Sequence, residues 1–297
     1  MLFLLAMDHR DSLEHDVYGI AGEPAPDDIA RIAHGKLLVY RGLEAAIEAG
    51  ADAESAGVLV DERFGARVAR LARAGGVDLA MPVERSGQTL LVLEYGDDWL
   101  EHVADFDPDQ VKVLVRDNPD DNPAGRAAQF ASLAVVSLAL EQAARSFIIE
   151  LLVPATPEQL ASVGGDPLRY DTELRPGLTV TVMADFQDHA IEPTIWKIEG
   201  LETADAATEV VRQAQSGGRD EVRCIVLGRD APATRLDHWL SIAAATPGFI
   251  GFAIGRSIWE QPLRDHLAGG TENDLIAAVA ANYRHFADVY TAVLPAE

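Results

Sequence analysis

The sequence of 297 residues contains one cysteine, Cys224, and only three lysines. A single cysteine excludes a disulfide within the chain and is typical of a reducing compartment, so the cytoplasm is the expected location. The formal net charge of −24 argues against DNA, RNA or anionic membranes as partners, because these need clustered Lys and Arg. A small phosphorylated ligand is compatible with this charge, since it requires only a few local donors.

Long hydrophobic runs are also missing. No apolar stretch approaches the roughly 18 residues of a membrane span. The opening "MLFLLAMDHRD" is apolar for seven residues and has neither a basic segment ahead of it nor a small-residue cleavage site, so it is a poor secretory signal. The chain has no Gly-rich dinucleotide fingerprint, P-loop or Cys/His metal spacing. We therefore expect no cofactor, no metal and no membrane partner.

Short apolar runs of β type alternate along the chain with longer segments of helical period. The runs are rich in Val, Ile and Leu with little polar alternation, as in parallel strands covered on both faces. They occupy eight stretches: 2–8, 56–65, 77–84, 110–117, 146–154, 194–200, 223–230 and 249–257. Helical stretches include 27–48, 122–145, 202–215, 232–245 and the tail 272–291, and several begin near Asp or Asn, which cap helices.

Eight strand-plus-helix units in this length predict an α/β fold, a single-domain (β/α)8 TIM barrel over residues 1–297. A doubly wound open sheet is the competing architecture, and periodicity does not exclude it. In a barrel the active site lies at the C-terminal ends of the strands, so charged residues that close each apolar run are candidates for the site. They are Asp8 and Arg10, Asp61 and Glu62, Glu84, Lys112 with Arg116 and Asp117, Glu150, Lys197 with Glu199, Arg229 and Arg256.

Glu150 and Lys197 stand out in this set because both interrupt apolar strands, "FIIELLVP" and "TIWKIEG". An unpaired charge at such a position is costly. A buried Lys197–Glu150 ion pair without chemistry is one interpretation, and Lys112 in "VKVLV" has the same alternative as a structural partner. Taken singly, Asp61, Glu62, Arg116 and Arg229 are most simply solvated or in structural ion pairs.

The scarcity of lysine favours a chemical role. A primary amine can lose its proton and attack a carbonyl to form a Schiff base, which a guanidinium does not do. Apolar walls and a second cation favour the neutral amine of a buried lysine. Lys36 lies in a helical stretch and is expected to be an ordinary helix lysine, which leaves Lys112 and Lys197 as the candidates.

Two "G-R" turns follow the seventh and eighth apolar runs, Gly228–Arg229 in "LGRD" and Gly255–Arg256 in "IGRS". Loops at these places in a barrel often bind phosphate through backbone N–H groups, and an arginine adds a bidentate cation. Together with a Schiff-base lysine, these turns indicate a phosphorylated sugar or keto acid as substrate.

These segments resemble class I aldolases of the tagatose 1,6-bisphosphate aldolase type, and more closely the 2-deoxy-5-keto-gluconate 6-phosphate aldolase domain of myo-inositol catabolism. The resemblance runs through "LLAMDHRDSL", "GVLVDERFG", "LAMPVERSGQ", "VKVLVRDNPDD", "ELLVP", "EPTIWKIEGLE", "CIVLGR" and "GFAIGRSIWEQPL". It implies that Lys197 forms the Schiff base, that Glu150 relays protons beside it and that Lys112 and Glu84 assist. It also implies that Asp8 and Asp61 contact substrate hydroxyls, with Arg10 nearby, and that Arg256 contacts a phosphate.

The expected function is therefore a metal-independent class I aldolase. If the inositol resemblance holds, the products are dihydroxyacetone phosphate and malonic semialdehyde. A phosphosugar isomerase or epimerase with Glu150 as base is one alternative, and a non-catalytic phosphometabolite sensor is another. The kinase domain to which the resembled aldolase domain is elsewhere fused is not part of this sequence. Barrels of this kind often associate through their helical layer, so a homo-oligomer is also compatible with the sequence.

Overall fold

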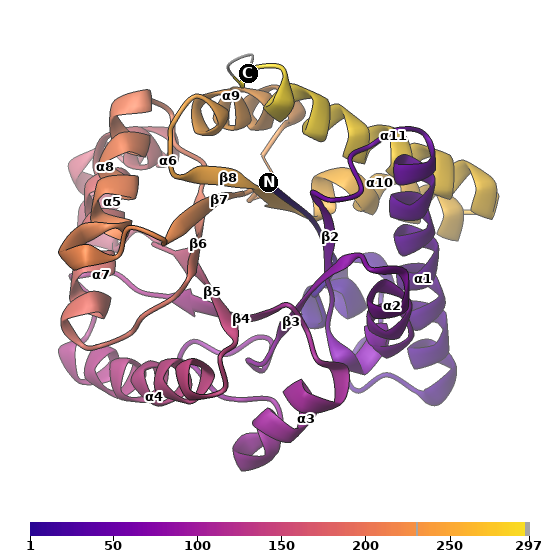
Figure 1. Cartoon of the computed structure of the whole chain (residues 1–297), viewed down its shortest axis with the longest axis horizontal. Helices are drawn as coiled ribbons and strands as arrows, with labels where there is room; N and C mark the ends of the chain where they lie inside the picture. Colours follow the sequence, from indigo (N-terminus) through magenta and orange to yellow (C-terminus); the bar gives the residue numbers. More distant parts are fainter. Residues whose placement is uncertain (230, 295–297) are drawn as a thin grey trace.

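Eight parallel strands close into a barrel in the computed structural model, which describes residues 1–229 and 231–294 (Figure 1). Each strand pairs with the next in the chain, and β8 pairs with β1. The predicted (β/α)8 barrel is thus confirmed, and the open sheet is excluded. The strands are β1 (Leu2–Ala6), β2 (Ala56–Leu59), β3 (Asp78–Pro82), β4 (Gln110–Arg116), β5 (Ser146–Leu152), β6 (Ile195–Glu199), β7 (Arg223–Leu227) and β8 (Phe249–Ile254).

Helices surround the ring of strands in Figure 1. They are α1 (Pro26–Glu48), α2 (Glu62–Gly75), α3 (Trp99–Phe106), α4 (Pro123–Gln142), α5 (Pro157–Ser162), α6 (Pro167–Arg169), α7 (Arg175–Asp188), α8 (Ala204–Ala214), α9 (Ala233–Ala244), α10 (Arg256–Leu267) and α11 (Glu272–Thr291). Short turns of π-helix, η1 (Leu13–Val17) and η3 (Tyr170–Leu174), and of 3-10 helix, η2 (Gly96–Asp98) and η4 (Ser216–Gly218), complete the order.

The predicted segments agree closely with this order. All eight apolar runs contain a strand, and the five predicted helices correspond to α1, α4, α8, α9 and α11. Side chains cap several helix starts, as expected: Asp61 accepts from the backbone N–H of Phe64, and Asn122 from that of Ala124. The strands are shorter than the runs, because the charged ends of the runs lie beyond the ladder. The last residue of the predicted seventh run, Asp230, and residues 295–297 lie outside the described residues.

The barrel interior is filled by inward-facing apolar side chains that form their own cluster: Leu2, Leu4, Ala6, Leu59, Ala80, Ile148, Ile195, Ile225 and Ala253. Because side chains two residues apart on a strand share a face, the next inward positions are Glu150 on β5 and Lys197 on β6, and Asp8 just beyond the end of β1. A dry apolar layer therefore supports a charged layer nearer the C-terminal ends. At the closure of the barrel, a Cβ on Gly251 would lie 1.9 Å from the Leu2 carbonyl oxygen, so β8 approaches β1 at a position that only glycine fits.

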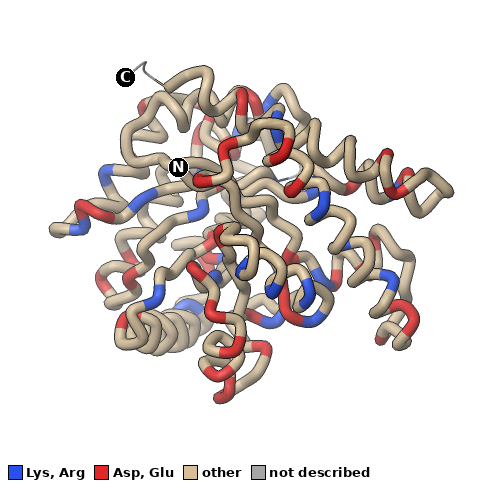
Figure 2. The backbone as a smooth tube through the Cα atoms, turned by 45° about the vertical axis from the view of Figure 1, so that its right-hand side comes forward, with Lys and Arg blue, Asp and Glu red and all other residues tan. Residues whose placement is uncertain are grey.

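Helix α4 is, among the described residues, long and apolar enough to span a membrane by length and composition alone. It lies against the barrel between β4 and β5 and buries Phe130, Leu133, Val136 and Leu140 among other side chains. One such helix is weak evidence for membrane insertion, since core helices of soluble proteins pass the same test. Acidic and basic residues are interspersed over the outer helices (Figure 2).

Candidate active site

A pocket of ≈ 310 Å³ lies among residues at the C-terminal ends of the strands and in the loops that follow them. Although the chain carries a formal charge of −24, this pocket is lined by more cations than carboxylates. The cationic residues are Arg10, Arg85, Lys112, Arg116, Lys197, Arg229 and Arg256, and the acidic ones are Asp8, Glu84 and Glu150. A concave site with this excess of positive charge favours an anionic ligand.

Five of these residues form what we call the lysine cluster: Asp8, Glu84, Lys112, Glu150 and Lys197. Lys112 lies at its centre on β4, with its side chain 1% exposed. Its Nζ donates to Asp8 Oδ2 at 2.8 Å and to Glu84 Oε1 at 2.9 Å, and it contacts Glu150 Oε2 at 2.8 Å. The ammonium thus fills the space between three carboxylates that come from three different parts of the barrel.

Glu150 connects the two lysines. The register of β5 and β6 places Glu150 opposite Lys197, and its Oε1 lies 2.8 Å from Lys197 Nζ while its Oε2 contacts Lys112. Both side chains are almost fully buried yet line the pocket. A carboxylate in this position can exchange a proton with whatever group is bound to the Lys197 nitrogen.

The charged forms of the lysine cluster are mutually stabilised. Burial favours neutral Lys112, but the carboxylates of Asp8, Glu150 and Glu84 raise its pKa above the ordinary value. Burial likewise opposes ionisation of Glu150, but Lys112 and Lys197 lower its pKa below the usual range. The pKa of Asp8 is lowered for the same reason, with Lys112 again the nearest cation. Lys112 is therefore a permanent cation beside the Lys197 amine.

Glu84 differs from the other two acids. It accepts from Lys112 through Oε1 and pairs with Arg10 at 3.5 Å, while its Oε2 is buried without a hydrogen-bond partner among the described residues. Burial raises the pKa of Glu84. A pocket-lining acid with a raised pKa and an unused oxygen can donate a proton to a ligand or polarise it. Arg10 also pairs with Glu94 at 3.6 Å.

The turn after β8 forms another side of the pocket. Gly255 precedes α10, and Arg256 and Ser257 are the first residues of that helix. The first N–H groups of a helix have no intrahelical acceptor and favour an anion. A Cβ on Gly255 would lie 2.4 Å from the Ala6 carbonyl oxygen and 2.8 Å from the His9 ring, so this turn packs directly against the end of β1. Gly228 lines the pocket after β7.

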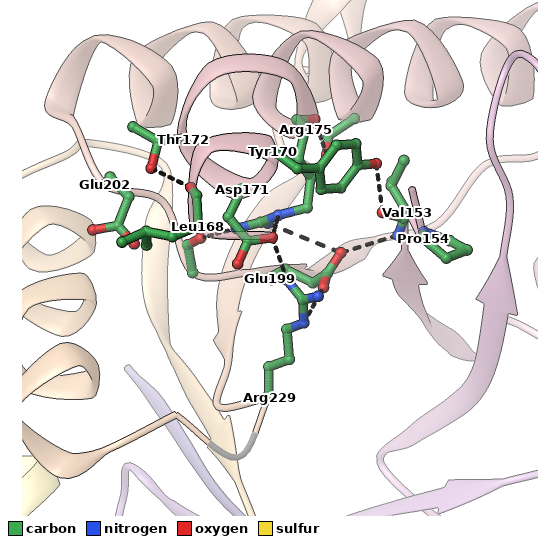
Figure 3. A network of polar contacts seen from close by, with 12 residues as sticks. Val153, Pro154, Leu168, Tyr170, Asp171, Thr172, Arg175, Glu199, Glu202 and Arg229 are labelled. Carbon is green, nitrogen blue, oxygen red and sulfur yellow. Dashed lines mark hydrogen bonds and ion pairs between the residues drawn. The ribbon is translucent and has the colours of Figure 1, made fainter. Parts of the chain in front are cut away.

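Arg229, after β7, is held by two carboxylates. Its backbone is left-handed, with φ of 45°, and its guanidinium contacts Glu199 Oε1 at 3.0 Å and Asp171 Oδ1 at 2.6 Å. Figure 3 shows the side chain rising from the end of β7 toward these two carboxylates. The residue lines the pocket, but its charge is already matched by protein groups.

The partners of Arg229 belong to a second network, which we call the arginine cluster: Asp171, Arg175, Glu199 and Arg229. Arg175 is fully buried, donates to Asp171 Oδ1 at 3.1 Å and donates to the Gly200 carbonyl at 2.8 Å. Glu199 Oε2 accepts from the Val153 N–H at 2.9 Å (Figure 3). The cluster ties together the segments that follow β5, β6 and β7.

Two sequence expectations are corrected by the positions of Lys36 and Asp61. Lys36 is not an ordinary helix lysine, because its side chain is 3% exposed and pairs with Asp61, which is 1% exposed. Helix α1 is covered on more than one side, so its central residues are buried around the circumference. Asp61 is absent from the pocket lining and is engaged by Lys36 and by the start of α2, so its position does not favour substrate contact.

Some residues that line the pocket are not among the site residues predicted from the sequence. His9 lines the pocket, and its Nδ1 is buried with no hydrogen-bond partner in the described part of the chain. Burial lowers its pKa to about 4. Its neighbours Asp8 and Arg10 drew attention by charge, whereas a single histidine after a strand gives no pattern. The loop of residues 85–92 lines the pocket after Glu84 and includes the half-exposed Leu90. Arg116 also lines the pocket, rather than being only a solvated strand end.

Solved structures with the same fold include several aldolases. Fructose-bisphosphate aldolase from Plasmodium falciparum matches with a TM-score of 0.67 and 13% identity, over 99% of this chain and 91% of that one. Cgl0159 from Corynebacterium glutamicum matches with a TM-score of 0.58 and 16% identity, over 97% and 85%. Fructose-bisphosphate aldolase from Slackia heliotrinireducens matches with a TM-score of 0.57 and 12% identity, over 100% and 87%. At these identities the likeness concerns the fold alone.

No curated protein matches the chain. A family model does match it over residues 1–293, which is nearly the whole sequence. The chain therefore belongs to the family described as "Uncharacterized protein conserved in bacteria (DUF2090)".

Proposed function

We propose that this barrel is a class I aldolase that cleaves a phosphorylated keto sugar or keto acid through an imine on Lys197. The observation that supports this most directly is the Glu150 carboxylate, which lies 2.8 Å from Lys197 Nζ and 2.8 Å from Lys112 Nζ. An amine beside a proton acceptor and a fixed cation, in a pocket that favours anions, is suited to imine chemistry on an anionic ketone. The aldolase barrels among the similar structures agree with this reaction class.

In the first half of the reaction, the neutral Lys197 amine attacks the substrate ketone and forms a carbinolamine. Loss of water, with a proton supplied from a neighbouring acid, gives a protonated imine on Lys197. Lys112 remains cationic throughout because of its three carboxylates. In this proposal Asp8 and Arg10, which line the pocket, contact substrate hydroxyls and anionic groups.

In the second half, Glu150 removes the proton from the hydroxyl whose carbon becomes the aldehyde. The electrons of the C–C bond move into the imine, which becomes an enamine while the aldehyde leaves. Protonation of the enamine carbon and hydrolysis then release the ketone product and regenerate the lysine. Glu84, with its raised pKa, polarises an adjacent substrate oxygen. This mechanism needs no metal.

The phosphate is assigned to the turns after β7 and β8. Gly255, Arg256 and Gly228 line the pocket there, and the start of α10 supplies backbone N–H groups. Arg229 contributes less directly in this scheme, because Glu199 and Asp171 already hold its guanidinium. For the substrate itself we propose 2-deoxy-5-keto-gluconate 6-phosphate, which gives dihydroxyacetone phosphate and malonic semialdehyde.

Borohydride trapping tests this proposal. The protein is incubated with dihydroxyacetone phosphate, reduced and digested, and the adduct is located by mass spectrometry. We expect one adduct, on the peptide containing Lys197, and lyase activity that chelators do not inhibit. Solvent isotope exchange without C–C cleavage would indicate an isomerase or epimerase instead. Ligand binding with neither adduct nor product would indicate a sensor.

A further inference from the structure

We propose that Lys36 and Asp61 form a positioning pair that fixes the backbone on both sides of Asp8. Lys36 comes from the middle of α1, and Asp61 lies at the start of α2. Neither lines the pocket, so neither contacts a ligand there. The kinetic consequences of this pair rest on the proposed function, whereas its structural consequence does not.

The geometry centres on the ammonium of Lys36. Its Nζ donates to the Met7 carbonyl at 2.6 Å and to the His9 carbonyl at 2.9 Å, and it also donates to Asp61 Oδ1. These three acceptors use all three hydrogens of the ammonium. The two carbonyls belong to the residues immediately before and after Asp8, so one side chain holds the Met7–Asp8 and the His9–Arg10 peptide groups.

The backbone at this point has little other support. Strand β1 ends at Ala6, and Met7 N–H makes the last bond toward β2, to the Leu59 carbonyl at 2.7 Å. Beyond it, Lys36 donates to two alternate carbonyls, those of Met7 and His9, as a neighbouring strand would. Asp61 anchors Lys36 in turn, because its Oδ2 accepts from the Phe64 N–H at 2.8 Å and thereby ties the pair to α2.

A contribution to stability alone does not explain this arrangement. A buried ion pair is often no more stabilising than apolar side chains of similar volume, because both charges lose their hydration. The Phe64 ring centroid also lies 5.7 Å from the Lys36 Nζ, so the ammonium has an aromatic neighbour. A methionine would fit such a site, but it would leave the Met7 and His9 carbonyls without their donor.

The position of Asp8 matters because the lysine cluster is continuous. Asp8 Oδ2 accepts from Lys112 at 2.8 Å, Lys112 contacts Glu150, and Glu150 contacts Lys197. A shift of the Met7–His9 segment would therefore displace one of the three carboxylates around Lys112. Small displacements of this kind lower the rate of a reaction that depends on aligned groups.

The test compares Lys36→Met with Leu43→Ala, a control on the same helix. Leu43 is fully buried on the same helix, so its replacement should destabilise the fold while leaving the Lys36 hydrogen bonds to Met7 and His9 available. We expect Lys36→Met to lower kcat by on the order of 10- to 100-fold with little change in KM. The control should retain kcat near the wild-type value even if its Tm falls as far as that of Lys36→Met. Equal losses of kcat in the two folded variants would overturn the proposal.

Asp61→Asn refines the comparison. The amide oxygen can still accept from the Phe64 N–H, and Lys36 can still reach both carbonyls, but the charge of the partner is gone. We therefore expect a loss of kcat between those of the control and Lys36→Met. A loss larger than that of Lys36→Met would contradict the assignment of the main effect to the two carbonyls.

A crystal structure of Lys36→Met tests directly, without an activity assay, whether Lys36 positions Asp8. We expect Asp8 to move out of contact with Lys112 or to occupy more than one conformation, while Glu150 stays between the two lysines. Asp8 unchanged beside Lys112 would overturn the positioning role. If the wild-type protein forms no imine, the proposed reaction falls, but a displaced Asp8 in this variant would still support the positioning pair.

Discussion

The lysine cluster and the arginine cluster lie at the same end of the barrel and are built from the same acidic residue types, yet their chemical capacities differ. In the lysine cluster, Glu150 joins two amines, both of which line the pocket with their nitrogens beside a proton acceptor. In the arginine cluster, Asp171 and Glu199 hold guanidiniums that remain protonated. The first arrangement can transfer protons and form covalent bonds, whereas the second holds loops in place.

The strongest test of this contrast is Lys197→Arg. The substitution keeps a cation beside Glu150 but removes the amine to which we assign the imine. We expect turnover to fall by about 10⁴-fold or more, as when a nucleophile is lost. Steady-state assays and borohydride trapping measure this, and an adduct on Lys112 in the variant would show that the two lysines exchange roles.

Glu150→Gln should separate imine formation from bond cleavage. The amide is close in shape to the acid but does not accept the substrate proton, so we expect turnover to fall by about 10³-fold, within the range for general bases. Trapping of an adduct on Lys197 should persist. Normal turnover in this variant would show that another group is the base.

Arg175→Met should act on stability instead. It leaves Asp171 and Glu199 with one cation fewer in a buried setting, and loss of one partner of a buried pair costs about 3–5 kcal/mol of unfolding free energy. Denaturant unfolding measures this loss. The folded fraction should keep kcat within about threefold of wild type, which is a small effect on the activation free energy. A large drop in kcat at full folding would mean that the arginine cluster takes part in catalysis.

His9 predicts a dependence of stability on pH. Its pKa is lowered to about 4 in the folded protein by burial, against 6.5 for the free side chain. Between these values the unfolded state binds more protons, so stability falls as pH decreases from about 6.5 to 4, by on the order of 3 kcal/mol. In His9→Asn this part of the acid sensitivity should vanish, as followed by unfolding at several pH values. If the unfolding free energy of His9→Asn depends on pH as in the wild type, another group causes the acid sensitivity.

The smallest effect is expected for Arg229→Lys. If its guanidinium mainly holds Glu199 and Asp171, a lysine can replace part of that contact, and KM for a phosphorylated substrate should change by less than about threefold. Arg256→Lys is the matched comparison, since Arg256 lies at the start of α10 on the pocket. If Arg229→Lys raises KM as much as Arg256→Lys does, Arg229 contacts the phosphate as directly as Arg256.

The two "G-R" turns show that local sequence does not predict the partners of a loop residue. Gly228–Arg229 and Gly255–Arg256 look alike in the sequence, and both line the pocket as predicted. The partners of Arg229 come from distant parts of the chain, because Asp171 and Glu199, which lie 58 and 30 positions before it, fold back onto it. Glu150 and Lys197, in contrast, were predictable, since a charge inside an apolar strand requires a partner and adjacent strands can provide one. Local pattern therefore identifies the strand residues, while loop partners depend on the closed fold.

Lys36 illustrates the same limit in a helix. Its sequence neighbours, Leu37 and Leu38, are buried, and so is Gly35, so the helix has no solvent face at this point. Periodicity alone assigns a lysine to the exposed side. Only the packing of α1 between the barrel and neighbouring helices explains why the residue needs Asp61 and two backbone carbonyls.

The burial of all three lysines also determines how the protein reacts with amine-reactive reagents. The exposed surface presents arginine but no lysine amine, so acylating labels find only the α-amino group on the intact protein. Each further label must enter through the pocket or through opening of the barrel. The number of acyl groups added per molecule, measured by mass, would then count how many of the buried amines have become accessible.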